Sequence, residues 1–458
     1  MRQSSIYGRI GLVFLFSFFA LGVLSPARAD VDIQGDVQPS NPNDWGITVE
    51  SYIGDTATGS VEINGGSSLA SHRCYVGNTS GATGTFTITG ENSLFTIDNN
   101  FSIGYYGTGT LNITGGGAIN NTSASMIGFR IGSSGSAIVD GDGSIWSNNT
   151  IYIGSHGNGT LDITNQGLVE AYDTYIGLGS VLHNILTVDG AGSTLRGNRL
   201  FVGYAGSGTL HVLNGATAHS NNTFGDSNLG YKSSGNGTVT IDGLGSTWIN
   251  ENSLFVGNEG DGLLTIQNGG LVTVGEILTI DNNNRGNSFI NMSDGGVLAI
   301  AGDVDDSLTS FLGLVQGTDT IRWWDPAVAD WNLLTTATAG TDYTLAYIND
   351  GGDLDGYTLL TVTAIEPPAG DANFDGQVDA SDATILAGNW QAGPGASWLM
   401  GDFNGDGYVN ASDATILAGN WQAGTGATSV PEPTSILLLV MLGLAVGCWG
   451  TFIKRATK

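Results

Sequence analysis

The sequence predicts an all-β fold: a right-handed parallel β-helix (β-solenoid) with a β-rich C-terminal cap, followed by a small α-helical module and a C-terminal transmembrane helix. Glycine supplies 73 of the 458 residues, without the every-third-residue spacing of collagen. Short alternating segments recur about every 25 residues between Gly- and Asn-rich turns. Hydrophobic residues make up 40% of the chain, which argues against general disorder.

Acidic residues dominate the body of the chain. Residues 30–433 hold all 42 Asp and Glu and only seven Lys and Arg, a formal charge of −35. Such a surface repels nucleic acid and disfavours other polyanions, whereas it suits an extracellular protein that meets divalent cations. Cys74 is the only cysteine outside the apolar tail, so we expect no disulfide bond and a small, buried Cys74 side chain.

The N-terminus has the pattern of a secretory signal peptide, residues 1–29. Arg2 and Arg9 precede the apolar run 10–24. The small-x-small cleavage pattern and the expected mature start are Ala27, Ala29 and Asp30. We therefore expect an exported protein. A retained membrane anchor is the alternative, although the apolar run is short for one.

Residues 30–302 carry the repeats of the predicted solenoid. One signature is Gly-Thr followed by alternating residues, as in 109–113 (GTLNI), and the other is an aromatic residue followed by Ile or Val and Gly, as in 152–154 (YIG). Two types of turn alternate after the Gly-Thr segments. One resembles Asn-Gly-Gly and the other Asp-Gly-x-Gly-Ser. The larger unit therefore has about 50 residues and contains two similar coils.

Alternation places Leu111 and Ile113 on one face of a strand and Thr110 and Asn112 on the other. One coil cannot bury such a face, whereas stacked coils can. About ten coils at the ~4.8 Å strand spacing would form a rod roughly 50 Å long. A β-propeller is the rival, because its blades also need about 40–50 residues. The strands resemble repeats shared by autotransporter passengers and PEP-CTERM proteins, roughly over residues 50–300.

Residues 303–366 break the repeat, and we expect them to form the cap. Trp323, Trp324 and Trp331 gather here, followed by strand-like segments at 343–348 and 357–362. A cap would protect the exposed end of the solenoid. The alternative is that the tryptophans form an aromatic platform for sugars.

Residues 367–426 contain two Asp-rich segments, 371–382 and 402–413, which both run into the sequence ASDATILAGNWQAG. Calcium needs six or more oxygen ligands on a tight loop. Positions 1, 3, 5, 9 and 12 of each segment offer side-chain oxygens, position 7 offers a backbone carbonyl, and a glycine at position 6 permits the sharp turn. We therefore predict two calcium ions. The predicted ligands are Asp371, Asn373, Asp375, Gln377, Asp379, Asp382, Asp402, Asn404, Asp406, Tyr408, Asn410 and Asp413.

Both loops depart from the EF-hand pattern, because position 12 is Asp and no convincing helix precedes the loop. In both respects they resemble type I dockerins, in which a single helix follows the loop. We expect Ile385, Leu386 and Trp390 to form the apolar stripe of the first helix. The resemblance implies a cohesin-like partner, although Ala380-Ser381 and its repeat match the family's contact pair only partly. The alternatives are a purely structural calcium clip, or Asp-rich turns without metal.

Residues 430–458 combine a Pro-Glu-Pro motif, an apolar stretch at 435–453 and a basic end. The apolar stretch is long enough to span a bilayer, and the trailing cations would hold that end in the cytoplasm. The motif residues are Pro431, Glu432 and Pro433. The arrangement resembles the PEP-CTERM sorting signal. This resemblance implies recognition by an exosortase, removal of the tail and delivery to the cell surface or extracellular matrix. A plain single-pass anchor is the alternative.

The solenoid sequence offers no unique catalytic constellation. Asp140, Asp189 and Asp242 recur once per repeat, which is typical of turn residues. We therefore predict a non-enzymatic, exported structural or adhesive protein of the cell surface or extracellular matrix. The alternative is a polysaccharide-binding or polysaccharide-degrading protein, recruited to a complex through dockerin–cohesin-like contacts. Besides the exosortase, the candidate partners are a cohesin-like domain or an exopolysaccharide.

Overall fold

The computed structural model describes residues 30–179, 184–221, 225–304, 307–326, 328, 330–363, 368–373 and 377–421. The predicted signal peptide, the predicted ligand Asp375, the Pro431-Glu432-Pro433 motif and the predicted span 435–453 lie outside these residues. Within the described ranges, no helix is both long enough and apolar enough to cross a membrane.

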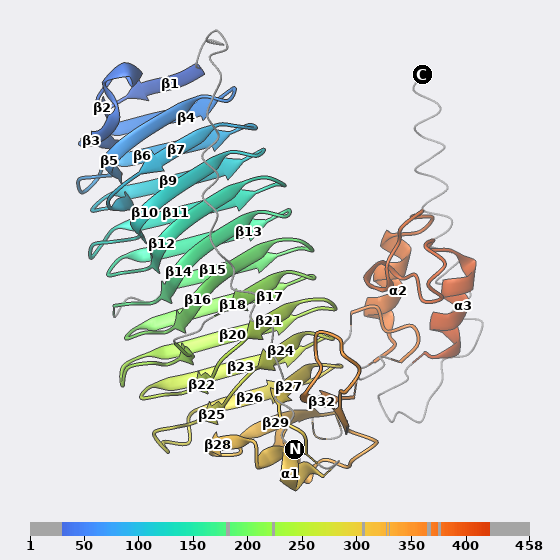
Figure 1. The fold of residues 1–458 in the computed structure, drawn as a ribbon. Coiled ribbons are helices and arrows are strands. Elements are labelled where there is room, and N and C mark those ends of the chain that lie inside the picture. The colour runs from blue at the N-terminus through green and yellow to red at the C-terminus, as the bar shows by residue number, and fades with distance from the viewer. Residues whose placement is uncertain are drawn as a thin grey trace, which may run out of the picture.

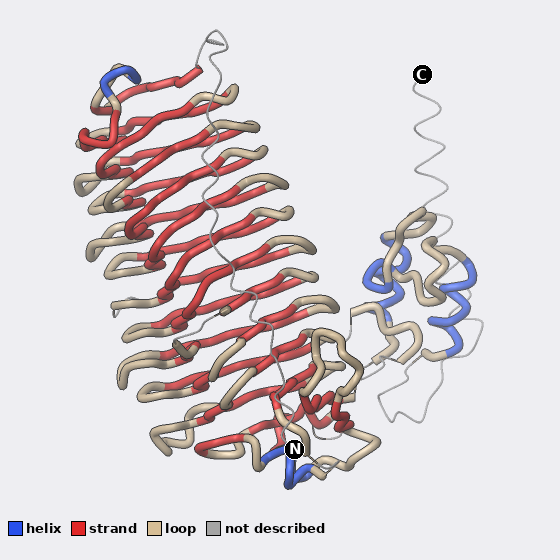
Figure 2. Tube along the Cα trace, in the orientation of Figure 1, coloured by secondary structure: helices blue, strands red, loops and turns tan. Residues whose placement is uncertain are grey.

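A 13-stranded sheet forms one face of a β-solenoid. Figures 1 and 2 show its strands stacked coil upon coil, with turns along the edges. Between β4 and β29 each strand pairs in parallel with the next member of the sheet. The strands are β1 (Asp30–Gly35), β4 (Thr58–Asn64), β6 (Thr83–Thr89), β9 (Thr108–Thr114), β11 (Ser134–Asp140), β13 (Asn158–Thr164), β15 (Asn184–Asp189), β17 (Ser207–Leu213), β20 (Asn236–Asp242), β23 (Asp261–Gln267), β26 (Phe289–Met292), β29 (Ile321–Asp325) and β30 (Asp330–Leu333).

The remaining strands of each coil form a second, bent face. In several coils this face is one long strand, such as β10, and in others it divides into two short strands, such as β7 and β8, which both pair with β10. The strands are β2 (Val37–Gln38), β3 (Gly46–Ile53), β5 (Ser68–Val76), β7 (Leu94–Ile97), β8 (Phe101–Ile103), β10 (Ala118–Ile127), β12 (Ile145–Ile153), β14 (Leu168–Ile176), β16 (Thr194–Val202), β18 (Thr217–Ser220), β19 (Ser227–Leu229), β21 (Thr247–Asn250), β22 (Leu254–Val256), β24 (Leu271–Val274), β25 (Leu278–Ile280), β27 (Val297–Ala301), β28 (Val315–Gly317), β31 (Tyr343–Tyr347) and β32 (Tyr357–Val362).

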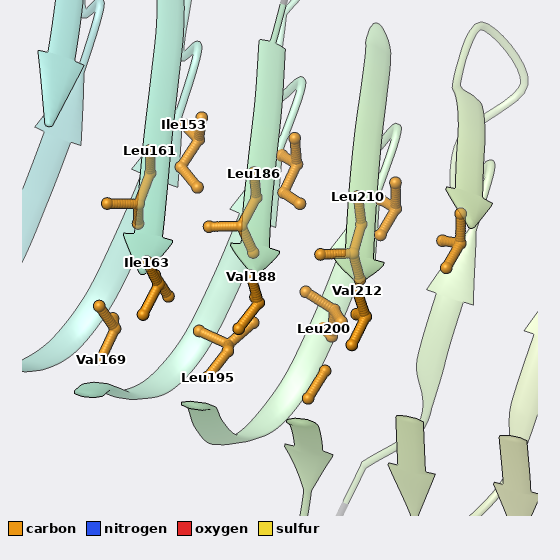
Figure 3. Packing of buried hydrophobic residues seen from close by; sticks show 14 of the residues in the cluster. Ile153, Leu161, Ile163, Val169, Leu186, Val188, Leu195, Leu200, Leu210 and Val212 are labelled. Carbon is orange, nitrogen blue, oxygen red and sulfur yellow. The ribbon is translucent and has the colours of Figure 1, made fainter. Parts of the chain in front are cut away.

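The predicted alternation of buried and outward residues is confirmed. Leu111 and Ile113 of β9 are fully buried, whereas Thr110 and Asn112 are half-buried. Equivalent residues of successive strands stack in rows inside the solenoid, as Leu161, Leu186 and Leu210 do in Figure 3. Each coil thus buries its apolar face against the coils above and below it, which a single coil could not do.

The buried cysteine also matches its prediction. Cys74 is fully buried and forms no disulfide. Burial raises the pKa of its thiol to about 12, so the side chain stays protonated at neutral pH and behaves as a small apolar residue.

The two alternating turn types interlock, which explains the 50-residue unit. The Ser246 hydroxyl accepts a hydrogen bond from the Gly215 N–H of the preceding coil (2.9 Å) and donates to the Asp242 carbonyl oxygen (2.6 Å). In the following coil, the Asn268 side chain donates to the Asp242 carboxylate (2.7 Å). An Asp-Gly-x-Gly-Ser turn therefore forms hydrogen bonds with the other turn type in the coil before it and in the coil after it. Two Asp-Gly-x-Gly-Ser turns in succession would lack these hydrogen-bond partners.

Antiparallel strands cover both ends of the solenoid. At the N-terminal end β1 pairs with β4 and β2 pairs with β3, which the sequence interpretation did not predict. At the other end the parallel ladders continue past residue 302, because β28 pairs with β25 and β29 with β26. β30 and β32 then pair in antiparallel fashion with β29 and β27. The predicted strands near 343–348 and 357–362 are present as β31 and β32. Both edges are therefore occupied rather than left open.

A separate apolar cluster lies in the C-terminal module. Its helices α2 (Ala380–Gly388) and α3 (Ala411–Gly419) carry the same nine-residue sequence. Leu386 is buried in this cluster and Ile385 and Trp390 pack against it, so the predicted stripe is confirmed. The other short helices of the chain are η1 (Pro42–Asp44), α1 (Leu308–Leu312), η2 (Leu334–Thr336) and η3 (Trp398–Met400).

Candidate calcium module

The second Asp-rich loop, 402–413, is described throughout, with Asp402 and Asp413 buried and Asn404 and Asp406 exposed. The buried Asp402 carboxylate accepts hydrogen bonds from the Asp406 N–H (3.2 Å) and the Gly407 N–H (2.8 Å). Asn404 Oδ1 also accepts from the Asp406 N–H (2.9 Å), and its amide donates to Asp406 Oδ2 (3.0 Å). Positions 1, 3 and 5 are therefore connected to one another by hydrogen bonds.

Positions 9 and 12 of this loop also begin helix α3. Asn410 is the N-cap, and Asp413 is fully buried and closes a capping box. The Asp413 carboxylate accepts hydrogen bonds from the backbone N–H groups of Phe403 (2.9 Å), Asn404 (3.2 Å) and Asn410 (2.9 Å). The sequence interpretation assigned these residues to calcium alone and missed this structural role, although the pattern Asn-x-x-Asp before a helix could have indicated it.

The first loop repeats this arrangement where it is described. Asp379 is the N-cap of α2, and the fully buried Asp382 carboxylate accepts from the N–H groups of Ala372 (2.8 Å) and Asp379 (2.8 Å). Asp371 is fully buried as well. Asn373 and Gln377 are exposed, and Tyr408, at the position of Gln377 in the second loop, is also exposed. Position 7 thus keeps its side chain in solvent, which agrees with a ligand role for its backbone carbonyl alone.

One residue that links the two halves was not predicted. The Trp398 indole N–H donates to the Asp371 carbonyl oxygen (2.6 Å), and its ring meets Phe403 edge to face at 5.3 Å. Trp398 therefore ties the first position of loop one to the second loop. Trp398 lies between the two repeated segments and has no counterpart in either of them. This sequence feature could have indicated its linking role.

The charge of the module favours a bound cation. Residues 369–420 contain seven Asp and no Lys, Arg or His. Four of these carboxylates, at positions 1 and 12 of the two loops, are buried. Taking ionised carboxylates out of water is costly unless an opposite charge compensates them. Because this part of the chain holds no cationic side chain, the compensating charge has to come from outside it.

The oxygen-only donor set fits calcium. A carboxylate has about four lone-pair sites, so the hydrogen bonds that it accepts from backbone N–H groups leave at least one lone pair for a metal ion. Among the described residues, no three Asp, Glu, His or Cys side chains lie close enough together to hold a metal ion. Ion binding in the second loop therefore has to draw Asp402, Asp406 and Asp413 toward one another. Calcium would supply the charge that makes this approach favourable.

Comparison with known proteins agrees with the loop chemistry. Residues 369–420 match the Dockerin type I domain. Type I dockerin domains bind calcium, and dockerin domains bind cohesin partners. The chain thus combines a β-solenoid with a segment, residues 369–420, that is similar to a type I dockerin domain.

One curated relative is the uncharacterized lipoprotein YdeK of Escherichia coli (strain K12), which is 30% identical over 106 residues. The match covers 22% of this chain and 8% of the relative, so the chain spans only a small part of that protein's length. No solved structure matches the chain.

Proposed function

We propose that the protein is an exported, non-enzymatic β-solenoid of the cell surface or extracellular matrix, with a structural or adhesive role. Two calcium ions stabilise its dockerin domain, which docks onto a cohesin-like partner, and an exosortase recognises Pro431-Glu432-Pro433 at the membrane. The dockerin match supports an extracellular, complex-forming protein, and the similarity to an uncharacterized lipoprotein also favours a place in the cell envelope. The observation that carries the proposal is a surface on which the same outward positions recur from coil to coil.

The clearest recurrent surface is a column of aromatic rings, which we name the aromatic column. Tyr52 stacks on Tyr75 (ring centroids 5.2 Å apart) and Tyr175 stacks on Phe201 (4.7 Å). These rings precede the buried Ile or Val of each aromatic-Ile/Val-Gly motif and therefore lie on the outer face. Its members form two stacks of rings, which Met126 separates at the position paired with Tyr152. The first stack contains Tyr52, Tyr75, Tyr105, Tyr106 and Phe129, and the second contains Tyr152, Tyr175, Phe201, Tyr204 and Tyr231.

Rare cations accompany this column. The Arg130 guanidinium lies 4.5 Å from the Phe129 ring centroid and donates to the Tyr105 hydroxyl (3.2 Å). The Lys232 ammonium lies 4.5 Å from the Tyr231 ring centroid. Burial raises the pKa of Tyr175 to about 12, so its hydroxyl remains a donor at neutral pH. Aromatic rings with hydroxyl groups and cations form an amphipathic surface of the kind enriched where proteins bind partners.

Surface delivery is expected to be visible by protease shaving of intact cells. Solenoid peptides should be released by proteinase K from whole cells, and replacing Pro431, Glu432 and Pro433 by alanine should abolish that release, because the exosortase could no longer recognise the tail. Mass spectrometry of the released peptides measures this release for the unaltered protein and for the alanine variant. Solenoid peptides that appear only after cell lysis would contradict surface exposure.

The second candidate function is binding of a neutral polysaccharide along the aromatic column. Tyr106 favours it, because its ring lies at 87° to that of Tyr105 and the residue is 47% exposed. A face that its neighbour does not cover can stack against a sugar ring, whereas the formal charge of −35 between residues 30 and 433 repels acidic polymers.

Affinity electrophoresis in gels with neutral cellulose derivatives is expected to retard the protein. Tyr106→Ala should weaken this retardation about tenfold, the equivalent of about 1.4 kcal/mol. Tyr172→Ala is the matched control, because Tyr172 is 53% exposed and outside the column. Equal retardation of the two variants, or preferential retardation by polygalacturonate, would contradict neutral-glycan binding at the column.

A further inference from the structure

One coil departs from the glycine rule of the solenoid. The aromatic-Ile/Val-Gly motif ends in a glycine with positive φ, as at Gly77 (φ 69°) and Gly257 (φ 82°). After β25 the corresponding residue is Asp281, with φ 52°. A side chain in this left-handed conformation is unusual, although Asp tolerates it better than most residues. The substitution therefore raises the question of what the Asp281 carboxylate does there.

The Asp281 carboxylate is buried and only half satisfied. The residue is 1% exposed, and its Oδ2 accepts a hydrogen bond from the Gly286 N–H (2.7 Å), so the carboxylate lies inside the turn that follows it. Its Oδ1 is buried and has no hydrogen-bond partner. An ionised oxygen without a partner and out of water is strongly unfavourable, and a cation would remove the penalty.

Residues 281–286 repeat the internal geometry of the dockerin loop 402–407. Position 1 accepts from the N–H of the glycine at position 6 in both loops, at 2.7 Å from Gly286 and 2.8 Å from Gly407. Position 3 is Asn in both, and its Oδ1 accepts from the N–H of position 5 at 2.9 Å in each. Positions 4 and 6 have positive φ in both loops. These angles are 55° at Asn284, 75° at Gly286, 70° at Gly405 and 84° at Gly407.

The two loops differ at position 5, where Arg285 replaces the acidic Asp406. The Arg285 guanidinium donates to the Ser233 carbonyl oxygen (3.3 Å). The turn therefore keeps one carboxylate, the oxygen of Asn283 and the carbonyl at position 7, Asn287. Fewer acidic ligands mean a weaker and more hydrated site, because ligand charge tunes calcium affinity.

We propose that residues 281–287 of the solenoid bind a further calcium ion, with Asp281 Oδ1 as the anchoring ligand. Asn283 and the Asn287 carbonyl add neutral oxygens, and water completes the coordination shell. Affinity on the order of 10⁻⁴–10⁻³ M, typical of extracellular modules, is expected from this donor set. The ion fixes the turn that leads into β26, the strand of the 13-stranded sheet that pairs in parallel with β29 near the C-terminal end of the solenoid.

The test compares the full chain with Asp281→Gly, which restores the residue found at this place in other coils. Isothermal calorimetry and equilibrium dialysis with Ca²⁺ should count one ion fewer in Asp281→Gly than in the unaltered chain. In chelator the variant should unfold at the same temperature as the unaltered chain or a higher one, because glycine removes the positive-φ strain. In 10 mM Ca²⁺ the unfolding temperature of the unaltered solenoid should rise about 2–4 °C more than that of the variant.

Two further variants separate this site from other effects. Asp189→Asn removes a surface carboxylate whose Oδ1 accepts from Asn214 (2.7 Å), so it should leave the ion count unchanged. Arg285→Asp supplies the missing acidic ligand and should tighten the weakest site about tenfold. Equal ion counts in the unaltered chain and Asp281→Gly would overturn the proposal, since a buried water would then satisfy Oδ1. Loss of an ion in Asp189→Asn would overturn it as well.

Discussion

Removal of calcium is expected to unfold the dockerin domain while the solenoid stays folded. Four buried carboxylates and three others share a segment without a cationic side chain. Without metal their mutual repulsion opposes closure of both loops. The module has only about 50 residues, and its apolar core around Leu386 and Leu417 is too small to offset this repulsion. A ligand at a thousand times its dissociation constant contributes about 4 kcal/mol, which is comparable to the whole stability of so small a unit.

Calcium stoichiometry and circular dichroism of residues 367–426 measure this effect. Asp375→Ala and Asp406→Ala should each lose about one ion, because each removes the carboxylate at position 5 of one loop. Asp379→Asn is the matched control. The second loop carries Asn410 at the same position, where it keeps both the helix cap and an oxygen ligand. Absence of calcium heat, together with an unchanged spectrum in chelator, would refute the prediction.

The sequence could predict the coils because each repeat carries its own local pattern. Buried Leu111 and Ile113 alternate with outward residues, and turn glycines mark most corners. The N-terminal end strand β1 lacks the Gly-Thr signature, because it pairs in antiparallel fashion with β4 and needs no turn to a preceding coil. β28 and β29 were missed as coil strands for a related reason, since α1 interrupts the spacing before them. End coils are set by long-range pairing, which a local pattern does not record.

In the candidate site, too, local features could be predicted from the sequence, whereas long-range contacts could not. Residue types and their spacing identified the dockerin-like loops, because the predicted ligands of each loop lie within 12 residues of sequence. The double use of Asp382 and Asp413 as buried caps emerged only from their hydrogen bonds to the loop backbone. Asp281 escaped prediction because its turn holds one carboxylate and an arginine at position 5. The two loops share Asp, Asn and Gly at positions 1, 3 and 6, but their likeness became clear only from backbone angles and hydrogen bonds.

Gly77→Ala is expected to destabilise the solenoid far more than Gly65→Ala. Both glycines have positive φ, 69° at Gly77 and 60° at Gly65, so alanine meets a similar backbone penalty of about 1–2 kcal/mol at either place. A Cβ at Gly65 would meet no atom within 4 Å. A Cβ at Gly77 would collide with the Thr108 carbonyl group of another coil. The difference between the variants therefore isolates the contact between coils.

The collision at Gly77 cannot be relieved by a side-chain movement, because the Thr108 atoms are backbone and the Cβ position is fixed by the backbone of residue 77. Separating the coils would stretch the hydrogen bonds from the Gly77 N–H to the Ile53 oxygen (2.8 Å) and from the Tyr105 N–H to the Gly77 oxygen (3.1 Å). A loss of about 4 kcal/mol or more is expected, against about 1–2 kcal/mol for Gly65→Ala. Urea unfolding followed by circular dichroism measures both variants. Because solenoid coils are stabilised mainly by their nearest neighbours, limited proteolysis should cut Gly77→Ala first near residues 77–108. Equal losses in the two variants would mean that the left-handed backbone, and not the close approach of the coils, requires glycine at this corner.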